Sequence, residues 1–315
     1  MQDTELRPLG AGELLDRAVT LYVRRFAPIV AVLAVAIVPL VIVDALLEPQ
    51  TTHLFTDIAN VLSAGGNSAA QRAALAALEG ESAPGWVTGL LWVVTAVVRL
   101  LQVSAVVAVV AAAYAGTQVT LHAAYALALR LWPRQLLVVL AFGAFALIAA
   151  VPLFMLYFLM ILVVLGVAIV AHAQVVTIAL GALFALVWIA LAVATFAWTY
   201  MAYNLAAVAV VTEQLEASAA IGAGLRRAFR RPTAVRSLIA GLIVSALSFL
   251  GSLPVMGISA VVAALLHAPV LSYAIIAVGQ ILLEGLVLVF VVVYAADVRV
   301  RREGLDLLPE VPAPA

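Results

Sequence analysis

The sequence predicts an all-α protein that crosses a membrane six times. Three observations carry this prediction. Hydrophobic residues fill 67% of the 315 positions and charged residues only 10%, whereas soluble domains have about 45–50% and about 25%. Six stretches stay apolar over the roughly 20 residues that a helix needs to span a bilayer. The arginines, finally, cluster on alternate connections between these stretches.

The six predicted spans follow one another along a single integral membrane domain of residues 1–315. They cover residues 28–47, 86–113, 135–165, 175–211, 234–266 and 269–296. The boundary between the third and fourth spans is the least distinct, because only residues 171–174 interrupt an apolar run there. Residues 48–85, between the first two spans, are predicted to form an extracytoplasmic loop.

Arginine supplies all sixteen basic residues, and the distribution of these arginines predicts the orientation. Fourteen of the sixteen lie before the first span, after the last, or between spans two and three and spans four and five. Positively charged connections stay in the cytoplasm, so we expect both termini there. Arginine without lysine, beside abundant Ala and Val, indicates a bacterial source, and hence the cytoplasmic membrane. The net charge of zero gives no basis for binding nucleic acid, and the lack of cysteine excludes disulfides.

Three amphipathic segments indicate an internal repeat. They cover residues 12–28, 121–133 and 220–232, and each ends in Arg and Pro before an apolar span. A proline suits the first turn of the following helix, where its missing N–H costs no hydrogen bond. We therefore predict three parallel pseudo-repeats of one amphipathic interfacial helix and two spans, at about 9–113, 114–211 and 212–307. Alternatively, Arg-Pro recurs wherever a cytoplasmic helix meets a span.

A basic rim is predicted on the cytoplasmic side. It comprises Arg24, Arg25, Arg130, Arg226, Arg227, Arg230, Arg231, Arg299, Arg301 and Arg302. One interpretation is that these side chains only anchor the helices and fix their orientation. The other is that they bind anionic lipid headgroups, at about 1 kcal/mol for each Arg, or a protein partner.

Two charged residues are predicted to lie deep in the membrane. Arg99 follows Trp86 by thirteen residues, and Glu284 follows Pro269 by fifteen. An unpaired charge at such a depth costs at least about 2.5 kcal/mol, so opposite charges at matched depth favour a pair. Gln102 and Gln280 lie one turn away and extend the pair to a polar cluster. Three alternatives remain open: a structural tie between spans two and six, a site for an ion or lipid headgroup, and no contact.

The sequence contains no recognisable catalytic set. Residues 257–260, Gly-Ile-Ser-Ala, are similar to the serine motif of rhomboid proteases, but the only later histidine, His267, lies at a predicted outer turn. The four histidines are scattered and form no pattern of metal ligands. Tyr203 and Asn204 are interpreted as hydrogen-bonding groups between helices. We therefore expect no enzymatic activity, no cofactor and no metal.

Three segments carry a family resemblance. Residues 6–18 read LRPLGAGELLDRA, residues 294–307 read YAADVRVRREGLDL, and the arginine-rich segment 213–232 ends in RRP. Together they resemble bacterial membrane proteins that are labelled as the membrane domain of glycerophosphoryl diester phosphodiesterase. In the enzymes of that name a separate soluble barrel carries the catalytic His, Glu and metal-binding carboxylates. These 315 residues contain no such barrel, so the resemblance implies no catalytic residues here.

The two terminal segments that carry the resemblance also predict a clamp of opposite charges. It joins the N-terminal helix, through Asp16 and Arg17, to the exit of the last span, through Asp297 and Glu303. As a whole the sequence favours a non-enzymatic membrane module, such as a scaffold or an accessory subunit. A transporter or channel-like protein for a lipid or small solute is the alternative, and an intramembrane lipid hydrolase is a weaker one. Membrane lipids are the expected partners.

Overall fold

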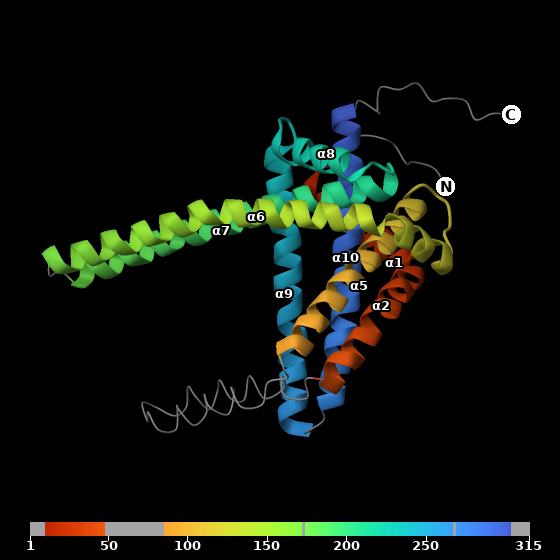
Figure 1. Cartoon of the computed structure of the whole chain (residues 1–315), viewed down its shortest axis with the longest axis horizontal. Helices are drawn as coiled ribbons and strands as arrows, with labels where there is room; N and C mark the ends of the chain where they lie inside the picture. The colour runs from red at the N-terminus through yellow and green to blue at the C-terminus, as the bar shows by residue number, and fades with distance from the viewer. Residues whose placement is uncertain (1–9, 48–84, 172–173, 267–268, 304–315) are drawn as a thin grey trace. The chain divides into compact units, whose positions relative to one another are not determined.

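The computed structural model describes residues 10–47, 85–171, 174–266 and 269–303, and helices dominate these residues (Figure 1). Eight helices occupy the described ranges: α1 (Ala11–Arg24), α2 (Phe26–Leu47), α5 (Gly85–Tyr114), α6 (Leu121–Ala171), α7 (Gln174–Thr212), α8 (Ala217–Phe229), α9 (Ala234–Leu266) and α10 (Pro269–Glu303). The predicted outer loop, apart from Gly85, lies outside the described residues, as do the turns at 172–173 and 267–268.

Six of these helices, α2, α5, α6, α7, α9 and α10, are long and apolar enough to cross a membrane. This confirms the all-α fold class and the prediction of six spans for a polytopic membrane protein. The predicted division between the third and fourth spans is also confirmed, because α6 ends at Ala171 and α7 begins at Gln174. The three pseudo-repeats remain a prediction.

The second amphipathic segment differs from its expected form. Residues 121–133 do not make a separate interfacial helix, because α6 runs without a break from Leu121 to Ala171 and contains Pro133. The prediction that the Arg-Pro proline begins the following helix holds for Pro28, in the first turn of α2, and fails for Pro133. With 51 residues α6 extends over about 76 Å, well beyond a hydrocarbon core of about 30 Å.

Local signals in the sequence explain where two of the helices begin and end. Before α1, the backbone N–H of Gly10 donates to the Glu13 carboxylate at 2.7 Å, and an acidic group there also suits the positive end of the helix dipole. After α5, Gly116 adopts a φ of +77°, a conformation that lacks a steric penalty only in glycine. The backbone N–H of the next residue, Thr117, donates to the Ala112 carbonyl at 2.8 Å and so caps the C-terminal end of the helix.

The described chain divides into two compact units, which we treat separately. Unit 1 contains residues Met1–Arg17, Leu131–Ser245 and Phe290–Ala315, and unit 2 contains Ala18–Arg130 and Ala246–Val289. The boundary passes through the long helices α6, α9 and α10, so each of them contributes one portion to each unit.

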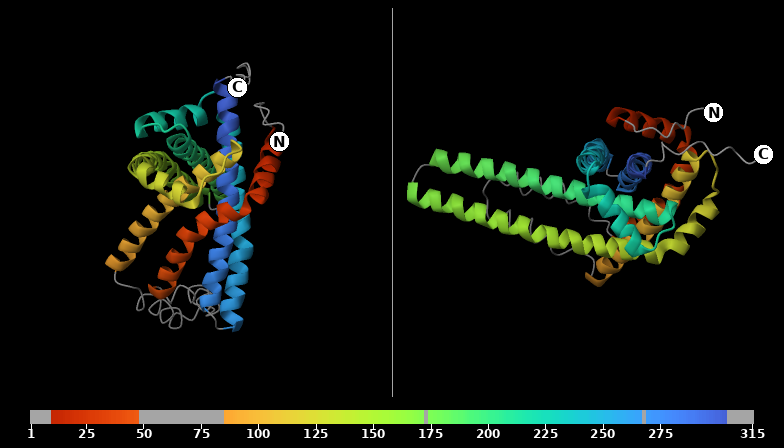
Figure 2. Two further views of the ribbon diagram at one scale, coloured as in Figure 1. Left: turned by 90° about the vertical axis from the view of Figure 1, so that its right-hand side faces the viewer. Right: turned by 90° about the horizontal axis from the view of Figure 1, so that it is seen from above.

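In unit 1, the C-terminal half of α7 forms the core. The run from Leu205 to Val211 is buried throughout, whereas most large apolar side chains in the first half of α7 are exposed. Helices α6 and α7 run side by side as a long antiparallel hairpin (Figures 1 and 2). Gly224 of α8 and Gly241 of α9 lie directly against the α7 backbone, because a Cβ atom at either would meet an α7 carbonyl. Small residues thus let three helix backbones approach closely.

In unit 2, α10 packs against α2, α9 and the end of α1. Gly285 lies against Ile29 and Leu33 of α2, and Gly279 lies against Val255 of α9. The Tyr22 hydroxyl at the end of α1 donates to the Leu282 carbonyl at 3.1 Å. Burial raises the pKa of the Tyr22 phenol above its usual value of 10.0, so this donor stays protonated at physiological pH.

Gly224→Ala tests the close approach of α8 to α7. Both Gly222→Ala and Gly224→Ala improve helix propensity by about 1 kcal/mol. A Cβ at Gly224, however, would lie 2.5 Å from the Ala202 carbonyl oxygen, whereas one at Gly222 meets only the movable Arg226 side chain at 3.0 Å. We therefore expect Gly224→Ala to lower the unfolding temperature in detergent and Gly222→Ala to maintain or raise it. Equal shifts for the two variants would contradict the close approach.

Candidate functional site

The two deep charges meet in unit 2. Arg99 of α5 and Glu284 of α10 form an ion pair through Nη1 and Oε2, although 185 residues separate them in the chain. The Arg99 side chain is 37% exposed and that of Glu284 is 22% exposed in the isolated chain. Because both helices are apolar around these positions, the partner offsets most of the cost of placing each charge in hydrocarbon.

The predicted polar cluster is smaller than expected. Gln102 is completely buried, and neither its Nε2 nor its Oε1 has a hydrogen-bond partner among the described residues. Gln280 is half-buried, and no hydrogen bond joins it to the ion pair in the described ranges. The geometry therefore brings Arg99 and Glu284 together and leaves both glutamines out of the pairing.

A second group of charges lies at the junction of α7, α8 and α10 in unit 1. Arg227 donates two hydrogen bonds to the Glu213 carboxylate, at 2.7 and 2.9 Å, and both side chains are largely buried. Such a bidentate pair is the strongest arrangement that arginine makes with a carboxylate. Arg299 of α10 approaches the same carboxylate at 3.7 Å. We call Glu213, Arg227 and Arg299, with the Asp297 group described next, the junction network.

Asp297 is the second centre of the junction network. Its side chain is fully buried; it accepts a hydrogen bond from Arg301 at 2.8 Å and lies 3.9 Å from Arg236. One helical turn before Asp297, the Tyr294 hydroxyl is 2.9 Å from the Ser237 hydroxyl of α9. These contacts fix the last turns of α10 against the beginning of α9.

One arginine of the predicted basic rim, Arg227, is buried in the junction network. Arg227 is only 7% exposed and paired with Glu213, so its side chain is not exposed as expected of a residue that binds lipid headgroups. The reason is its position on α8: it follows Ala223 and Gly224 on the buried face, next to α7. Other predicted rim residues are exposed, namely Arg24, Arg130, Arg226, Arg230 and Arg231, whereas Arg25, Arg299 and Arg301 are half-buried. The side chain of Arg302 lies outside the described residues.

The predicted terminal clamp is only partly described. Asp16 is exposed on α1, Arg17 is half-buried, and the side chain of Glu303 lies outside the described residues. Asp297 is paired within unit 1, with Arg301 of its own helix and Arg236 of α9. A clamp between Arg17 and Asp297 therefore stays a prediction.

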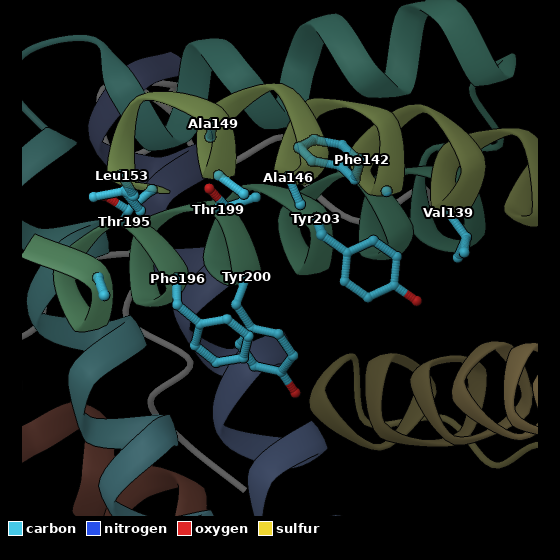
Figure 3. Close-up of a pocket in the computed structure, with 13 residues that line it drawn as sticks. Val139, Phe142, Ala146, Ala149, Leu153, Thr195, Phe196, Thr199, Tyr200 and Tyr203 are labelled. Atoms are coloured by element: carbon cyan, nitrogen blue, oxygen red, sulfur yellow. The ribbon is translucent and has the colours of Figure 1, made fainter. Parts of the chain in front are cut away.

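A cavity of about 430 Å³ lies between α6 and α7 in unit 1. Its lining is mostly apolar, and small residues predominate on the α6 side. Figure 3 shows the rings of Phe196, Tyr200 and Tyr203 projecting to one side of the two helices. The lining comprises Val139, Phe142, Gly143, Ala146, Ala149, Ala150, Leu153, Ala192, Thr195, Phe196, Thr199, Tyr200 and Tyr203. We call it the hairpin cavity.

Sequence reasoning missed several of these groups. Tyr203 was interpreted only as a hydrogen-bonding group between helices, but it lines the hairpin cavity, and the amide of Asn204 donates to Tyr200 within its own helix at 2.8 Å. Gln135 is buried and donates to the Ala207 carbonyl of α7 at 2.9 Å. One available signal was an acidic residue directly after a span, since Glu213 follows α7.

The serine of the motif that is similar to that of rhomboid proteases contacts another serine. The Ser259 hydroxyl lies 2.5 Å from that of Ser272 in unit 2, so its observed partner is another serine. Within the described ranges, no group of three or more His, Asp or Glu side chains is placed to hold a metal ion.

No protein-family model, curated protein or solved structure matches this chain. The fold alone therefore defines the class, a polytopic helical membrane protein.

Arg227→Met should destabilise unit 1 strongly. Methionine retains most of the apolar stem, but the Glu213 carboxylate would lose its bidentate partner at a largely buried position. Removal of one member of a buried pair costs about 3 kcal/mol or more. The matched control is Arg226→Met, because Arg226 is its exposed neighbour on α8. We expect a lower unfolding temperature for Arg227→Met only, and partial recovery when Glu213→Gln is added.

Gln102→Met should stabilise the protein. The substitution keeps the length of the side chain and removes two buried polar atoms that lack partners among the described residues. An unsatisfied buried polar group costs about 1–3 kcal/mol, so the unfolding temperature should rise. A decrease would contradict this prediction, because it would mean that a buried water or another group satisfies the amide.

Proposed function

We propose that the protein is a non-enzymatic membrane module, a scaffold or accessory subunit of the bacterial cytoplasmic membrane with both termini in the cytoplasm. The observation that supports this proposal is the ion pair of Arg99 and Glu284. The two charged side chains deep in the spans bind each other across two helices, as expected of a structural tie. Charges that serve transport more often line a water-filled path.

The junction network supports the same proposal from unit 1. Its carboxylates, Glu213 and Asp297, are paired with arginines of the same chain. The exposed arginines Arg226 and Arg230 remain available to anionic lipid headgroups or to a protein partner. In this proposal they anchor the module, and the buried pairs hold its helices in register. The resemblance to the membrane domain of phosphodiesterases fits such an accessory role.

A second candidate is a transporter or channel-like protein for a lipid or small solute. The hairpin cavity favours it, because a ligand-sized apolar space between two spans is a feature of binding sites in helical membrane proteins. Under this alternative Arg99 and Glu284 would be required for flux. Intramembrane lipid hydrolysis is a weaker candidate, and no observation in the described residues favours it.

Joint replacement of the ion pair separates the two candidates. Arg99→Leu or Glu284→Leu alone leaves one charge in the membrane, at a cost of at least about 2.5 kcal/mol for the arginine, so each should lower the unfolding temperature. The double variant removes both charges and should recover most of the loss, because an apolar pair can replace a buried ion pair. Thermal unfolding of the purified variants measures these shifts.

The same variants in proteoliposomes provide the functional measurement. The probe is transbilayer movement of a fluorescent phospholipid, followed by its accessibility to an external quencher. We expect no protein-dependent movement with the natural sequence or with the double Leu variant. Movement that the natural protein supports and the folded double variant loses would establish the transporter instead. Release of glycerol phosphate from a glycerophosphodiester by the purified protein would overturn both candidates.

A further inference from the structure

The hairpin cavity is built by a specific alternation of large and small side chains. Near the base of the hairpin the rings of Phe142 and Tyr203 meet at a centroid distance of 6.1 Å. Towards the tip, the rings of Tyr157 and Trp188 meet at 5.3 Å, and the Trp188 indole N–H donates to the Leu153 carbonyl at 3.0 Å. These aromatic contacts join α6 and α7 on both sides of a stretch of small residues that lines the cavity.

Small residues form much of the cavity wall. Gly143, Ala146 and Ala150 repeat at helical spacing along α6, and Ala192 faces them from α7. A Cβ added at Gly143 would meet nothing within 4 Å. Stripes of small residues normally let membrane helices pack closely. Here the stripe lines a cavity of about 430 Å³, within the usual range of ligand sites, about 300–1,000 Å³.

A hydroxyl in the wall of the hairpin cavity offers a donor to a ligand with an acceptor atom. Thr199 lines the cavity and is only 9% exposed, yet its hydroxyl forms no hydrogen bond with any described residue. The hydroxyls of Thr195 and Tyr203, which also line the cavity, likewise form none within the described ranges. A hydroxyl without a protein partner that lines an apolar cavity would gain a hydrogen bond from the acceptor atom of a bound molecule.

We propose that the hairpin cavity binds one acyl chain of an ester-linked membrane lipid, with the ester carbonyl accepting a hydrogen bond from Thr199. The apolar wall suits a hydrocarbon chain. From Val139 to Leu153 it extends over about 21 Å of helix. None of the thirteen lining residues is charged. A fatty-acid carboxylate would therefore lack a cationic partner there, whereas an ester carries no charge.

Gly143→Leu is the first test, because it fills the open space beside the α6 wall. The matched control is Gly166→Leu on the same helix: a Cβ there also meets nothing within 4 Å, but Gly166 lines no described cavity. Each protein is reconstituted in vesicles of phosphatidylethanolamine and phosphatidylglycerol that contain phosphatidylcholine with a diazirine in its acyl chain. Illumination attaches the probe, and peptide mass spectrometry locates it.

We expect labelling of the α7 segment from Ala192 to Tyr203, reduced about tenfold by Gly143→Leu and unchanged by Gly166→Leu. A tenfold loss corresponds to about 1.4 kcal/mol. If Gly143→Leu proves misfolded by size-exclusion chromatography, Ala192→Phe fills the cavity from the opposite wall and carries the same expectation. Equal labelling along all of α7 that neither cavity-filling variant reduces would show lipid around the helices only and would overturn the proposal.

Thr199→Val and competing lipids test the ester. Valine keeps the shape of threonine without the hydroxyl, so the loss of one hydrogen bond should weaken labelling by about 2–10-fold. An unlabelled diester phospholipid should compete well, a dialkyl ether phospholipid several-fold less well, and palmitate poorly. Equal competition by ester and ether lipids, or stronger competition by palmitate, would overturn the assignment of the carbonyl contact. These outcomes do not depend on the scaffold proposal, which rests on the ion pairs of units 1 and 2 and not on the hairpin cavity.

Discussion

The bilayer core contains almost no water, and the structure depends on how its polar groups are satisfied without it. Each charge there needs a partner, since an isolated one is too costly to insert. Arg99 and Glu284 meet this requirement through each other, and so bring α5 and α10 together within unit 2. Outside the spans, the buried pair of Glu213 and Arg227 joins α8 to the end of α7 in unit 1. Pairing therefore specifies which helices become neighbours. Apolar contacts alone would distinguish poorly between one apolar helix and another.

The same constraint explains why so few polar groups carry the tertiary structure. Helix α7 has an almost entirely apolar surface, so its neighbours recognise its backbone: Gln135 donates to the Ala207 carbonyl, and Gly224 and Gly241 lie against other α7 carbonyls. Small residues matter because van der Waals packing drives helix association when lipid is as apolar as the side chains. Bulky residues at these glycine positions would separate the helices and weaken that packing.

The sequence was sufficient for the fold class because its dominant signal is local. Apolar length identifies each span, and the interruption at residues 171–174 separated α6 from α7 correctly. The pair of Arg99 and Glu284 was predictable as well, because two opposite charges at similar depth in otherwise apolar helices have few alternative partners. The burial of Arg227 was not predicted, because neighbouring arginines look alike in sequence. Only the packing of α8 on α7 distinguishes the buried Arg227 from the exposed Arg226.

The hairpin cavity was beyond sequence reasoning for a related physical reason. A stripe containing Gly143, Ala146 and Ala150 predicts close helix packing when considered alone. In this hairpin the stripe instead lines a cavity, and the ring contacts of Phe142 with Tyr203 and of Tyr157 with Trp188 flank it. These contacts join residues 31 to 61 positions apart, so the pattern of one helix alone did not reveal them. The cavity is therefore a property of the hairpin as a whole, because residues of both α6 and α7 line it.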